Sequence, residues 1–220
     1  YQPENGWAEQ KPEDWAAAVL KTIKEVVSKS GADKDEVKGI GISGQMHGLV
    51  MLDEAGKVIR PSIIWCDQRT GAEVEDMLKI MPKEEWIRIT ANPPLTGWTA
   101  AKILWVRKNE PENYNCCRHI LLPKDYIRYI LTGVFATEVS DASGMQLLDV
   151  PGRCWSDEVL EALKIDKNLL GKVYESCEAT GTLLPEVAQE LGLSESCVVA
   201  GGAGDNAAAA VGNGVVKDGT

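Results

Sequence analysis

The feature that most constrains this fold is a glycine-rich corner between a short apolar run and a helix of small residues. Cys197-Val198-Val199-Ala200 predicts a buried strand, Gly201-Gly202-Ala203-Gly204 turns the chain, and residues 207–211 predict a helix. Glycine permits sharp turns and close approach of other groups. A strand, a tight turn and a helix in this order are typical of the sheet edge at which α/β proteins bind ligands.

Apolar periodicity predicts the remaining elements. The clearest helix is residues 12–30, with acidic Glu13 and Asp14 in its first turn and Gly31 at its end. Strands are predicted at residues 37–44, 49–53, 58–59 and 62–65, and further helices at 70–81, 83–89, 99–108, 123–131, 156–163 and 184–191. We expect an α/β protein with one domain over residues 1–220; a helix-rich subdomain over about 70–170 is the alternative.

Charge and hydropathy exclude several classes of partner. The chain has 23 Lys+Arg against 33 Asp+Glu, a formal charge of −10, and no basic run that could bind nucleic acid or an anionic membrane. No apolar stretch approaches the roughly 18 residues that span a bilayer, and the opening residues do not resemble a signal peptide. Six cysteines without a CxxC pair indicate reduced thiols rather than a zinc site. We expect a cytoplasmic protein.

Asp205 is the first candidate for chemistry because it follows the corner at the start of the predicted helix. Backbone N–H groups at a helix N-terminus favour an ionised carboxylate, which can act as a general base. The alternative is that Asp205 only caps the helix. The sequence alone does not choose between these two interpretations.

The same corner satisfies the pattern G-x-G-x-x-A at Gly202, Gly204 and Ala207, which raises the alternative of a dinucleotide-binding oxidoreductase. Asp205 argues against it, because its charge would stand where the helix N-terminus must receive a pyrophosphate. No Gly-Lys-Ser or Gly-Lys-Thr follows the glycines, so the segment is not a Walker loop either.

A second candidate is the loop Ser43-Gly44-Gln45-Met46-His47-Gly48 between two predicted strands, where polar side chains bracketed by glycines suit a small polar ligand. His47 alone is more often a structural residue than a ligand contact. Trp65 ends a predicted strand; a tryptophan there can form the wall of a sugar site or belong to the core.

Taken in order, five segments resemble motifs of one family, the carbohydrate kinases of the FGGY group, and within that group the xylulose kinases. They are Gln45-Met46-His47-Gly48, Trp65-Cys66-Asp67-Gln68-Arg69, Leu121-Leu122-Pro123-Lys124-Asp125-Tyr126, Ser140-Asp141-Ala142-Ser143-Gly144 and Gly204-Asp205-Asn206-Ala207. Residues 97–109 also match the family's first signature, with Lys102 and Trp105 at its fixed positions. Five ordered matches along the whole chain are more specific than any single one.

This resemblance implies an actin-like, ribonuclease H-like α/β domain that binds the sugar, the first of two domains in the full protein. It implies ATP-dependent phosphorylation of a ketose, with ATP and Mg²⁺ as cofactors and with sugar and ATP as small-molecule partners. Met46-His47 is the xylulose-kinase pattern, whereas glycerol kinases carry Arg-Glu, so D-xylulose is the expected substrate. Ribulose, glycerol and gluconate are alternatives.

The resemblance also implies roles for individual residues. Asp205 would take the proton from the sugar hydroxyl as that hydroxyl attacks the γ-phosphoryl group of Mg-ATP. Met46, His47 and Asn206 would line the sugar site, and Trp65 matches a position that walls the substrate in glycerol-type members. No residue of this chain is assigned to a metal.

The resemblance further implies segments that these residues do not include. The family's opening strand, with its phosphate-binding hairpin and metal-site aspartate, should precede Tyr1, and the nucleotide domain should follow Thr220. We therefore expect a domain truncated at both ends and inactive by itself, whose exposed strand edges favour association; a homodimer is compatible with this. A non-catalytic nucleotide-binding protein on the same fold is a further alternative, but it would need no sugar-lining loop at Gln45 to Gly48.

Overall fold

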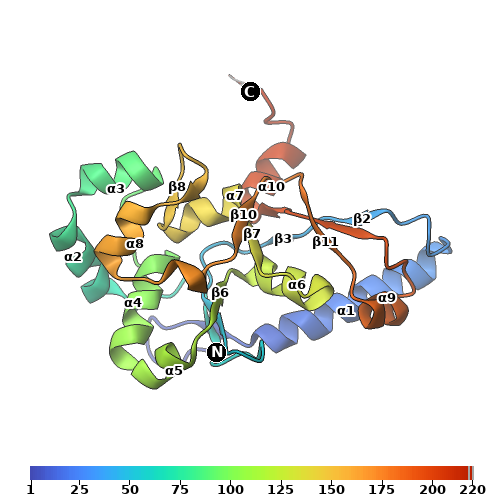
Figure 1. Ribbon diagram of the computed structural model, residues 1–220, viewed down its shortest axis with the longest axis horizontal. Helices are drawn as coiled ribbons and strands as arrows, with labels where there is room; N and C mark the ends of the chain where they lie inside the picture. The colour runs from blue at the N-terminus through green and yellow to red at the C-terminus, as the bar shows by residue number, and fades with distance from the viewer. Residues whose placement is uncertain (218, 220) are drawn as a thin grey trace.

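The structure, a computed structural model, describes residues 1–217 and 219 of the chain. Figure 1 shows strands with α1, α6 and α9 on one side of the molecule and a group formed by α2, α3, α4, α5 and α8 on the other. The helices are α1 (Pro12–Ser30), α2 (Gly71–Ile80), α3 (Lys83–Thr90), α4 (Thr99–Asn109), α5 (Pro111–Cys116), α6 (Pro123–Thr132), α7 (Val139–Ala142), α8 (Asp157–Leu163), α9 (Pro185–Leu191) and α10 (Asp205–Gly212), with 3₁₀ turns at Ser143–Met145 and Lys167–Leu169.

The strands are short and pair in small groups. They are β1 (Glu9–Gln10), β2 (Gly39–Ile40), β3 (Ser43–Gly44), β4 (Val50–Leu52), β5 (Ser62–Ile63), β6 (His119–Leu121), β7 (Ala136–Glu138), β8 (Leu148–Asp149), β9 (Cys154–Trp155), β10 (Lys172–Tyr174), β11 (Ala179–Thr182), β12 (Val198–Ala200) and β13 (Ala203–Gly204). β11 pairs antiparallel with β12, and β12 pairs parallel with β2. Farther along the same two segments, β13 pairs parallel with β3.

The glycine-rich corner joins β12 to β13. Gly202 has a φ of +75°, a left-handed conformation that glycine adopts without strain. A Cβ atom there would lie 2.1 Å from the carbonyl oxygen of Ile42, which belongs to the neighbouring segment between β2 and β3. The close approach of these two backbones therefore requires glycine.

β4 separates two hydrophobic clusters. Its successive side chains point to opposite faces, as strand geometry requires: Met51 and the adjoining Leu49 pack in the cluster with α2, α3, α4 and α8, whereas Val50 and Leu52 pack in the cluster with α1, α6 and α9. All four are fully buried. Burial on both faces explains why this segment is a continuous apolar run in the sequence.

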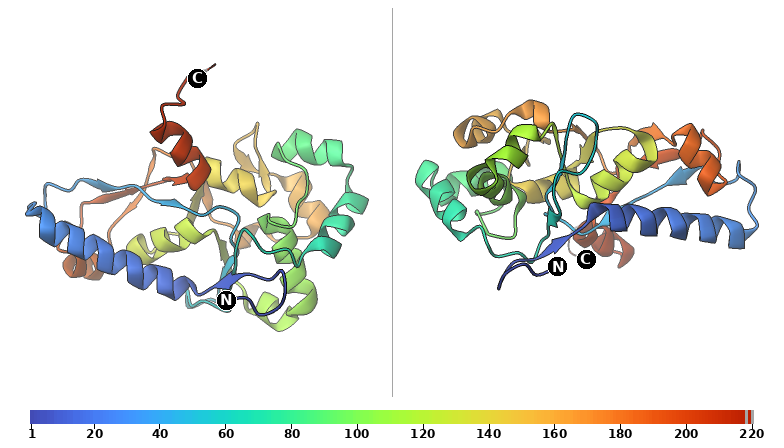
Figure 2. Two further views of the ribbon diagram at one scale, coloured as in Figure 1. Left: turned by 180° about the vertical axis from the view of Figure 1, so that it is seen from behind. Right: turned by 90° about the horizontal axis from the view of Figure 1, so that it is seen from below.

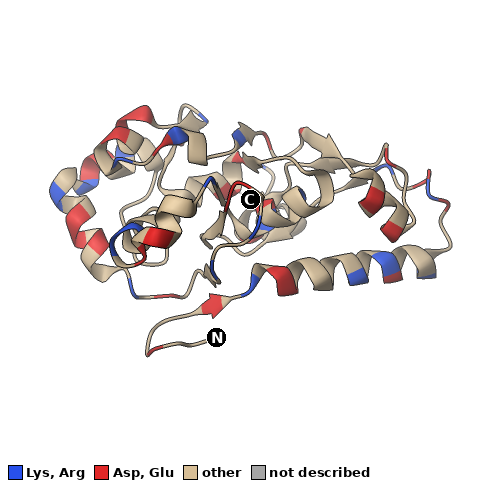
Figure 3. Cartoon of the chain, turned by 60° about the horizontal axis from the view of Figure 1, so that its bottom comes forward, with Lys and Arg blue, Asp and Glu red and all other residues tan. Residues whose placement is uncertain are grey.

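Many of the exposed charged residues lie on the outer helices. α1 lies alongside α6 and α9, as both views in Figure 2 show, and buries one face against them. Basic and acidic residues are interspersed along the outer faces of α1 and of the α2–α3 region (Figure 3). Within the described residues, no helix has the length and hydropathy needed to cross a membrane.

Sequence reasoning predicted some of these elements better than others. α1 has its predicted bounds, and Gly31 ends it with a φ of +68°. The Oγ of Ser156 accepts a hydrogen bond from the N–H of Val159, as expected of an N-cap. The predicted strand at residues 37–44 is wrong as a continuous element, because it divides into β2 and β3. The helix α5, which begins at Pro111, is absent from the predicted elements.

Replacing Gly202 with alanine should destabilise the protein by about 2–4 kcal/mol, because it adds a strained φ and a clash with the backbone of Ile42. Urea unfolding followed by tryptophan fluorescence measures this change. Gly41→Ala is the matched control, since a Cβ atom at Gly41 meets open space. Equal stabilities for the two variants would contradict this account of the corner.

Candidate active site

The parallel pairing of β3 with β13 brings the two candidate segments together. Ala203 is opposite Ser43 and Gly204 is opposite Gly44, so the loop from Gln45 and the helix α10 leave the same edge of the pair. That edge is where α/β sheets bind ligands. The structure thus places the histidine-bearing loop beside the start of α10.

Asp205 is the first residue of α10, and Gly204 is the N-cap. The interpretation of Asp205 as the helix cap is therefore wrong. Its Oδ1 accepts a hydrogen bond of 3.0 Å from the N–H of Asn206, and both side chains are exposed. A carboxylate with this position keeps free acceptor capacity on the open side of the edge.

Met46 and His47 pack against two glycines that flank this edge. The Nδ1 of His47 lies 3.0 Å from the carbonyl oxygen of Gly144, in the turn after α7. A Cβ atom at Gly144 would lie 2.4 Å from that Nδ1, and one at Gly204 would lie 2.8 Å from the Cγ of Met46. The loop is thus seated on the residue directly before Asp205.

The electrostatic surroundings of His47 include Asp205. Partial burial lowers the pKa of His47, and the ammonium of Lys102 lowers it further. The carbonyl of Gly144 and the carboxylate of Asp205 oppose this shift. The imidazole is therefore biased toward its neutral form, in which one ring nitrogen donates and the other accepts a hydrogen bond.

The aromatic neighbour of His47 is Trp98, which the sequence analysis did not select. The two ring centroids are 4.4 Å apart, and Trp98 is the N-cap of α4. Its only signal in the sequence was its place after Gly97, directly before a predicted helix. The backbone of His47 is left-handed, with a φ of +67°, and its carbonyl accepts hydrogen bonds from α4.

Trp65 is exposed, with 56% of its surface accessible. Its carbonyl oxygen lies close to Gly97: a Cβ atom added to Gly97 would lie 2.8 Å from that oxygen. This backbone contact places Trp65 near Trp98. The interpretation of Trp65 as a core residue is wrong.

The two charged residues that follow Trp65 are structural. Asp67 and Arg69 are joined by a bidentate ion pair, and Asp67 also accepts a hydrogen bond of 2.6 Å from the N–H of Ala8. The guanidinium of Arg69 lies 3.8 Å from the ring centroid of Trp7 and 4.8 Å from that of Trp105. These contacts fasten the N-terminal segment to α4.

Glu138 fixes the other side of the edge. This fully buried carboxylate accepts hydrogen bonds from the N–H groups of Ser140 and Asp141 and from the hydroxyls of Ser140 and Ser176. The hydroxyl of Ser140 in turn accepts a hydrogen bond of 3.1 Å from the N–H of Gly204. Glu138 therefore acts through Ser140 on the residue before Asp205.

Buried charges lie beneath the glycine-rich corner. Lys124 lies 2.8 Å from Asp125, 3.4 Å from Glu138 and 3.5 Å from Asp141. The pKa of Asp141 is raised to about 8, chiefly by burial; Lys124 opposes this rise, and the carboxylates of Asp125 and Glu138 add to it. Neither carboxyl oxygen of Asp141 has a hydrogen-bond partner among the described residues.

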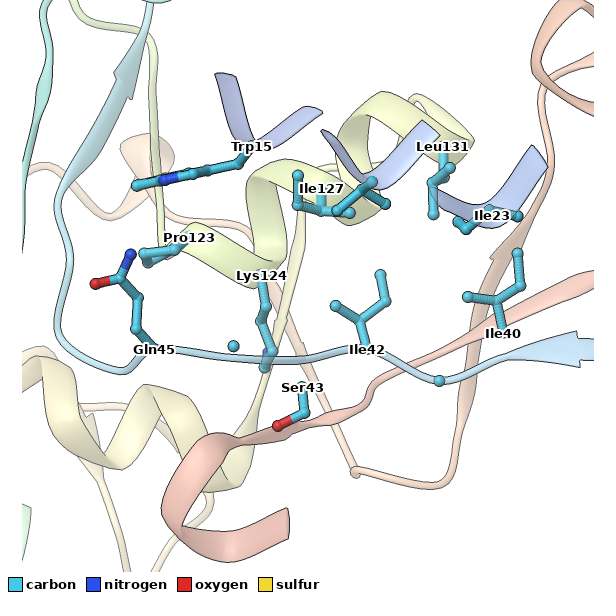
Figure 4. Close-up of a pocket in the computed structure, with 13 residues that line it drawn as sticks. Trp15, Ile23, Ile40, Ile42, Ser43, Gln45, Pro123, Lys124, Ile127 and Leu131 are labelled. Carbon is cyan, nitrogen blue, oxygen red and sulfur yellow. The ribbon is translucent and has the colours of Figure 1, made fainter. Parts of the chain in front are cut away.

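A separate apolar groove of about 370 Å³ lies between α1, α6 and the segment from β2 to Gln45. Figure 4 shows Ile40 and Ile42 pointing into it from the strand, opposite Ile127 and Leu131. The five candidates Met46, His47, Trp65, Asp205 and Asn206 do not line it. Its apolar walls offer few partners for sugar hydroxyls, so we place the candidate site at the β3–β13 edge.

Comparison with known proteins assigns a family to this arrangement. A sequence model described as "FGGY family of carbohydrate kinases, N-terminal domain" matches residues 1–212. The xylulose kinase of Escherichia coli (strain K12) is 44% identical over 210 residues, which are 96% of this chain and 42% of that protein. The xylulose kinase of Bacillus subtilis (strain 168) is 39% identical over 218 residues, 99% of this chain and 44% of that protein.

Solved structures agree with these sequences. The crystal structure of xylulose kinase from Rhodospirillum rubrum superposes with a TM-score of 0.95 at 26% identity, covering 100% of this chain and 45% of that one. The chain therefore spans less than half the length of the relatives it matches.

Asp141 generates a test of the buried charges. Its folded-state pKa lies above its unfolded value, so the folded state holds the extra proton and wild-type stability falls as pH rises from about 4 to about 8. Asn mimics the protonated form. Asp141→Asn should therefore gain stability over wild type as pH rises from 5 to 8, on the order of a few kcal/mol by pH 8.

Thermal unfolding at several pH values measures this difference. The matched control is Asp157→Asn, which removes a largely exposed carboxylate paired with Lys167 and should show no such trend. A difference between Asp141→Asn and wild type that does not change with pH would refute a protonated Asp141.

Proposed function

The chain belongs to the FGGY family of carbohydrate kinases and has the actin-like α/β fold of that family, and we propose that its protein phosphorylates D-xylulose with ATP, giving D-xylulose 5-phosphate. The observation that carries this proposal is the seating of Met46 against Gly204, the residue before Asp205, while the adjoining His47 packs against Gly144. That contact forms one small polar site from two distant segments. The names of the relatives from E. coli and B. subtilis support xylulose as the sugar.

Asp205 is the proposed general base. The sugar hydroxyl oxygen forms a bond to the γ-phosphorus of ATP, the bond from that phosphorus to the β–γ bridging oxygen breaks, and ADP leaves. The hydroxyl proton passes to the carboxylate of Asp205. Phosphoryl transfer has a loose transition state, so the protein contributes alignment, charge neutralisation and a group that receives a late proton. An exposed carboxylate on a rigid edge suits this role.

The remaining residues bind and orient the sugar. In the neutral imidazole of His47, Nδ1 donates to the carbonyl of Gly144, so Nε2 is free to accept a hydrogen bond from a sugar hydroxyl. Asn206 offers an amide beside the base, and Met46 supplies an apolar contact. Trp65 and Trp98 add aromatic faces, a common surface for the C–H face of a sugar ring.

ATP enters as a co-substrate, and Mg²⁺ bound to its phosphates would neutralise their charge. Mg²⁺ is usually held by one or two carboxylates together with substrate phosphates. In the described part of the chain, no three or more His, Cys, Asp or Glu residues cluster in a way that could hold a metal. We therefore assign no step of the reaction to a metal held by these residues.

The reaction and the sugar are tested together by one assay. The complete kinase is incubated with ATP and a panel of xylulose, ribulose, glycerol and gluconate, and ADP release is measured. We expect the highest kcat/KM for D-xylulose. A preference for another sugar would change the substrate, and no ADP release with any of them would overturn the proposed function.

Asp205→Ala in the complete kinase should lower kcat by about 10²- to 10⁴-fold, the usual effect of losing a positioned base, with the fold intact. Coupled ADP release measures kcat, and circular dichroism checks the fold. Glu195→Ala, at an exposed acid before β12, is the control and should keep wild-type kcat. Near-normal turnover in Asp205→Ala would remove the assignment.

His47→Ala should raise the KM for xylulose much more than the KM for ATP, about tenfold against less than twofold, because it removes a sugar contact. Steady-state kinetics with each substrate varied in turn separates the two. An effect confined to the KM for ATP would contradict the placement of His47 in the sugar site.

A further inference from the structure

Lys102 is a fully buried lysine that forms no ion pair with any of the described residues. Its side chain has no exposed surface, and among the described residues no carboxylate oxygen lies within ion-pairing distance of its Nζ. Burial lowers the pKa of Lys102 to about 7. Desolvating an ammonium group costs several kcal/mol, so packing alone does not account for a lysine at this place in α4.

The hydrogen bonds of Lys102 join two segments of the candidate site. Its Nζ donates to the carbonyl of His47 at 2.8 Å and to the carbonyl of Gly97 at 2.7 Å. Gly97 directly precedes Trp98, whose ring lies 4.4 Å from that of His47. One side chain therefore holds the backbones that carry both rings.

The backbone of His47 needs such support. Its left-handed conformation costs a residue other than glycine roughly 1 kcal/mol or more, and it persists only where the surroundings determine it. Thr99 supplies a second hydrogen bond, of 3.1 Å, to the same carbonyl. Both donors come from the first turns of α4, which apolar neighbours such as Ile103 and Val106 already anchor in the core.

We propose that Lys102 is a positioning residue of the sugar site: through the carbonyls of His47 and Gly97 it sets the spacing of the His47 and Trp98 rings, and so the affinity for the ketose. This inference rests on the proposed function. Lys102 acts through the backbone and does not touch the substrate. Methionine at this position would fill a similar volume without a charge to desolvate. Replacing Lys102 with methionine should therefore affect sugar binding rather than the packing of the core.

The test is Lys102→Met in the complete kinase, with Lys108→Met as the matched control. Lys108 lies on the same helix, its side chain is 60% exposed, and its contact is with Glu73. For Lys102→Met we expect the ketose Kd, measured by calorimetry without ATP, and the ketose KM to rise about tenfold, the effect of losing one hydrogen bond to a charged group. The KM for ATP should change less than twofold.

A double-mutant cycle separates positioning from general damage. If Lys102 acts through His47, the double variant of Lys102→Met and His47→Ala should bind ketose no more weakly than His47→Ala alone. Independent, additive losses would overturn the inference. So would an unchanged ketose Kd in Lys102→Met, or equal increases in the KM values for ketose and ATP.

Thr99→Val provides a second variant if Lys102→Met does not fold, because it removes the other donor to the same carbonyl. It should raise the ketose Kd in the same direction by a smaller factor, and an unchanged Kd would overturn the inference.

Wild-type activity distinguishes the proposed function from the proposed role of Lys102. A wild-type kinase that phosphorylates none of the sugars contradicts the proposed function, whereas normal ketose binding in the variants contradicts only the role of Lys102.

Discussion

The parallel pairing of β3 with β13 is the constraint on which the candidate site depends. It is only two residues long in each strand, yet it sets where the loop from Gln45 begins and where α10 begins. A shift of one residue would turn successive side chains to the opposite face and would separate Met46 from Gly204. The register is fixed because Gly202 and Gly204 allow approaches that any larger side chain would prevent.

The loops at this edge are held through their backbones by side chains from surrounding elements. Arg128 of α6 donates to the carbonyl of Gly201, the hydroxyl of Ser140 accepts from the N–H of Gly204, and Lys102 of α4 donates to the carbonyl of His47. Because these bonds use main-chain atoms, the side chains of His47 and Asp205 remain available to a substrate. Side chains that hold a site's loops in this way, without contacting the substrate themselves, fix the positions of the groups that do contact it.

The sequence predicted elements whose signal is local. α1 has a helical period and a glycine stop, and Ser156 caps α8 as its residue type suggests. The strands β7, β10 and β11 were not predicted, because strands this short are determined by their pairing partners more than by their own pattern.

Some residues of the candidate site could likewise be predicted from local sequence, whereas others could not. Asp205 and His47 could be selected because glycines bracket polar residues there, and the family motifs added Met46, Trp65 and Asn206. The family signature marks the position of Lys102, but the contribution of its side chain could not be predicted, because the signature does not say which backbone groups it reaches. Its hydrogen bond to His47 spans 55 residues of sequence. A contact of that kind becomes visible only when β4 and α4 are packed together.

The buried charges beneath the corner are stable only if they balance. Lys124 and Arg128 contribute two positive charges, while Asp125, Glu138 and Asp141 could contribute three negative ones. A pKa of about 8 keeps Asp141 largely neutral at pH 7, which leaves two charges of each sign. Electroneutrality reduces the desolvation penalty of the cluster. With the cluster neutral, the buried Arg128 can donate its hydrogen bond to the carbonyl of Gly201. That bond fixes the segment that leads to Asp205.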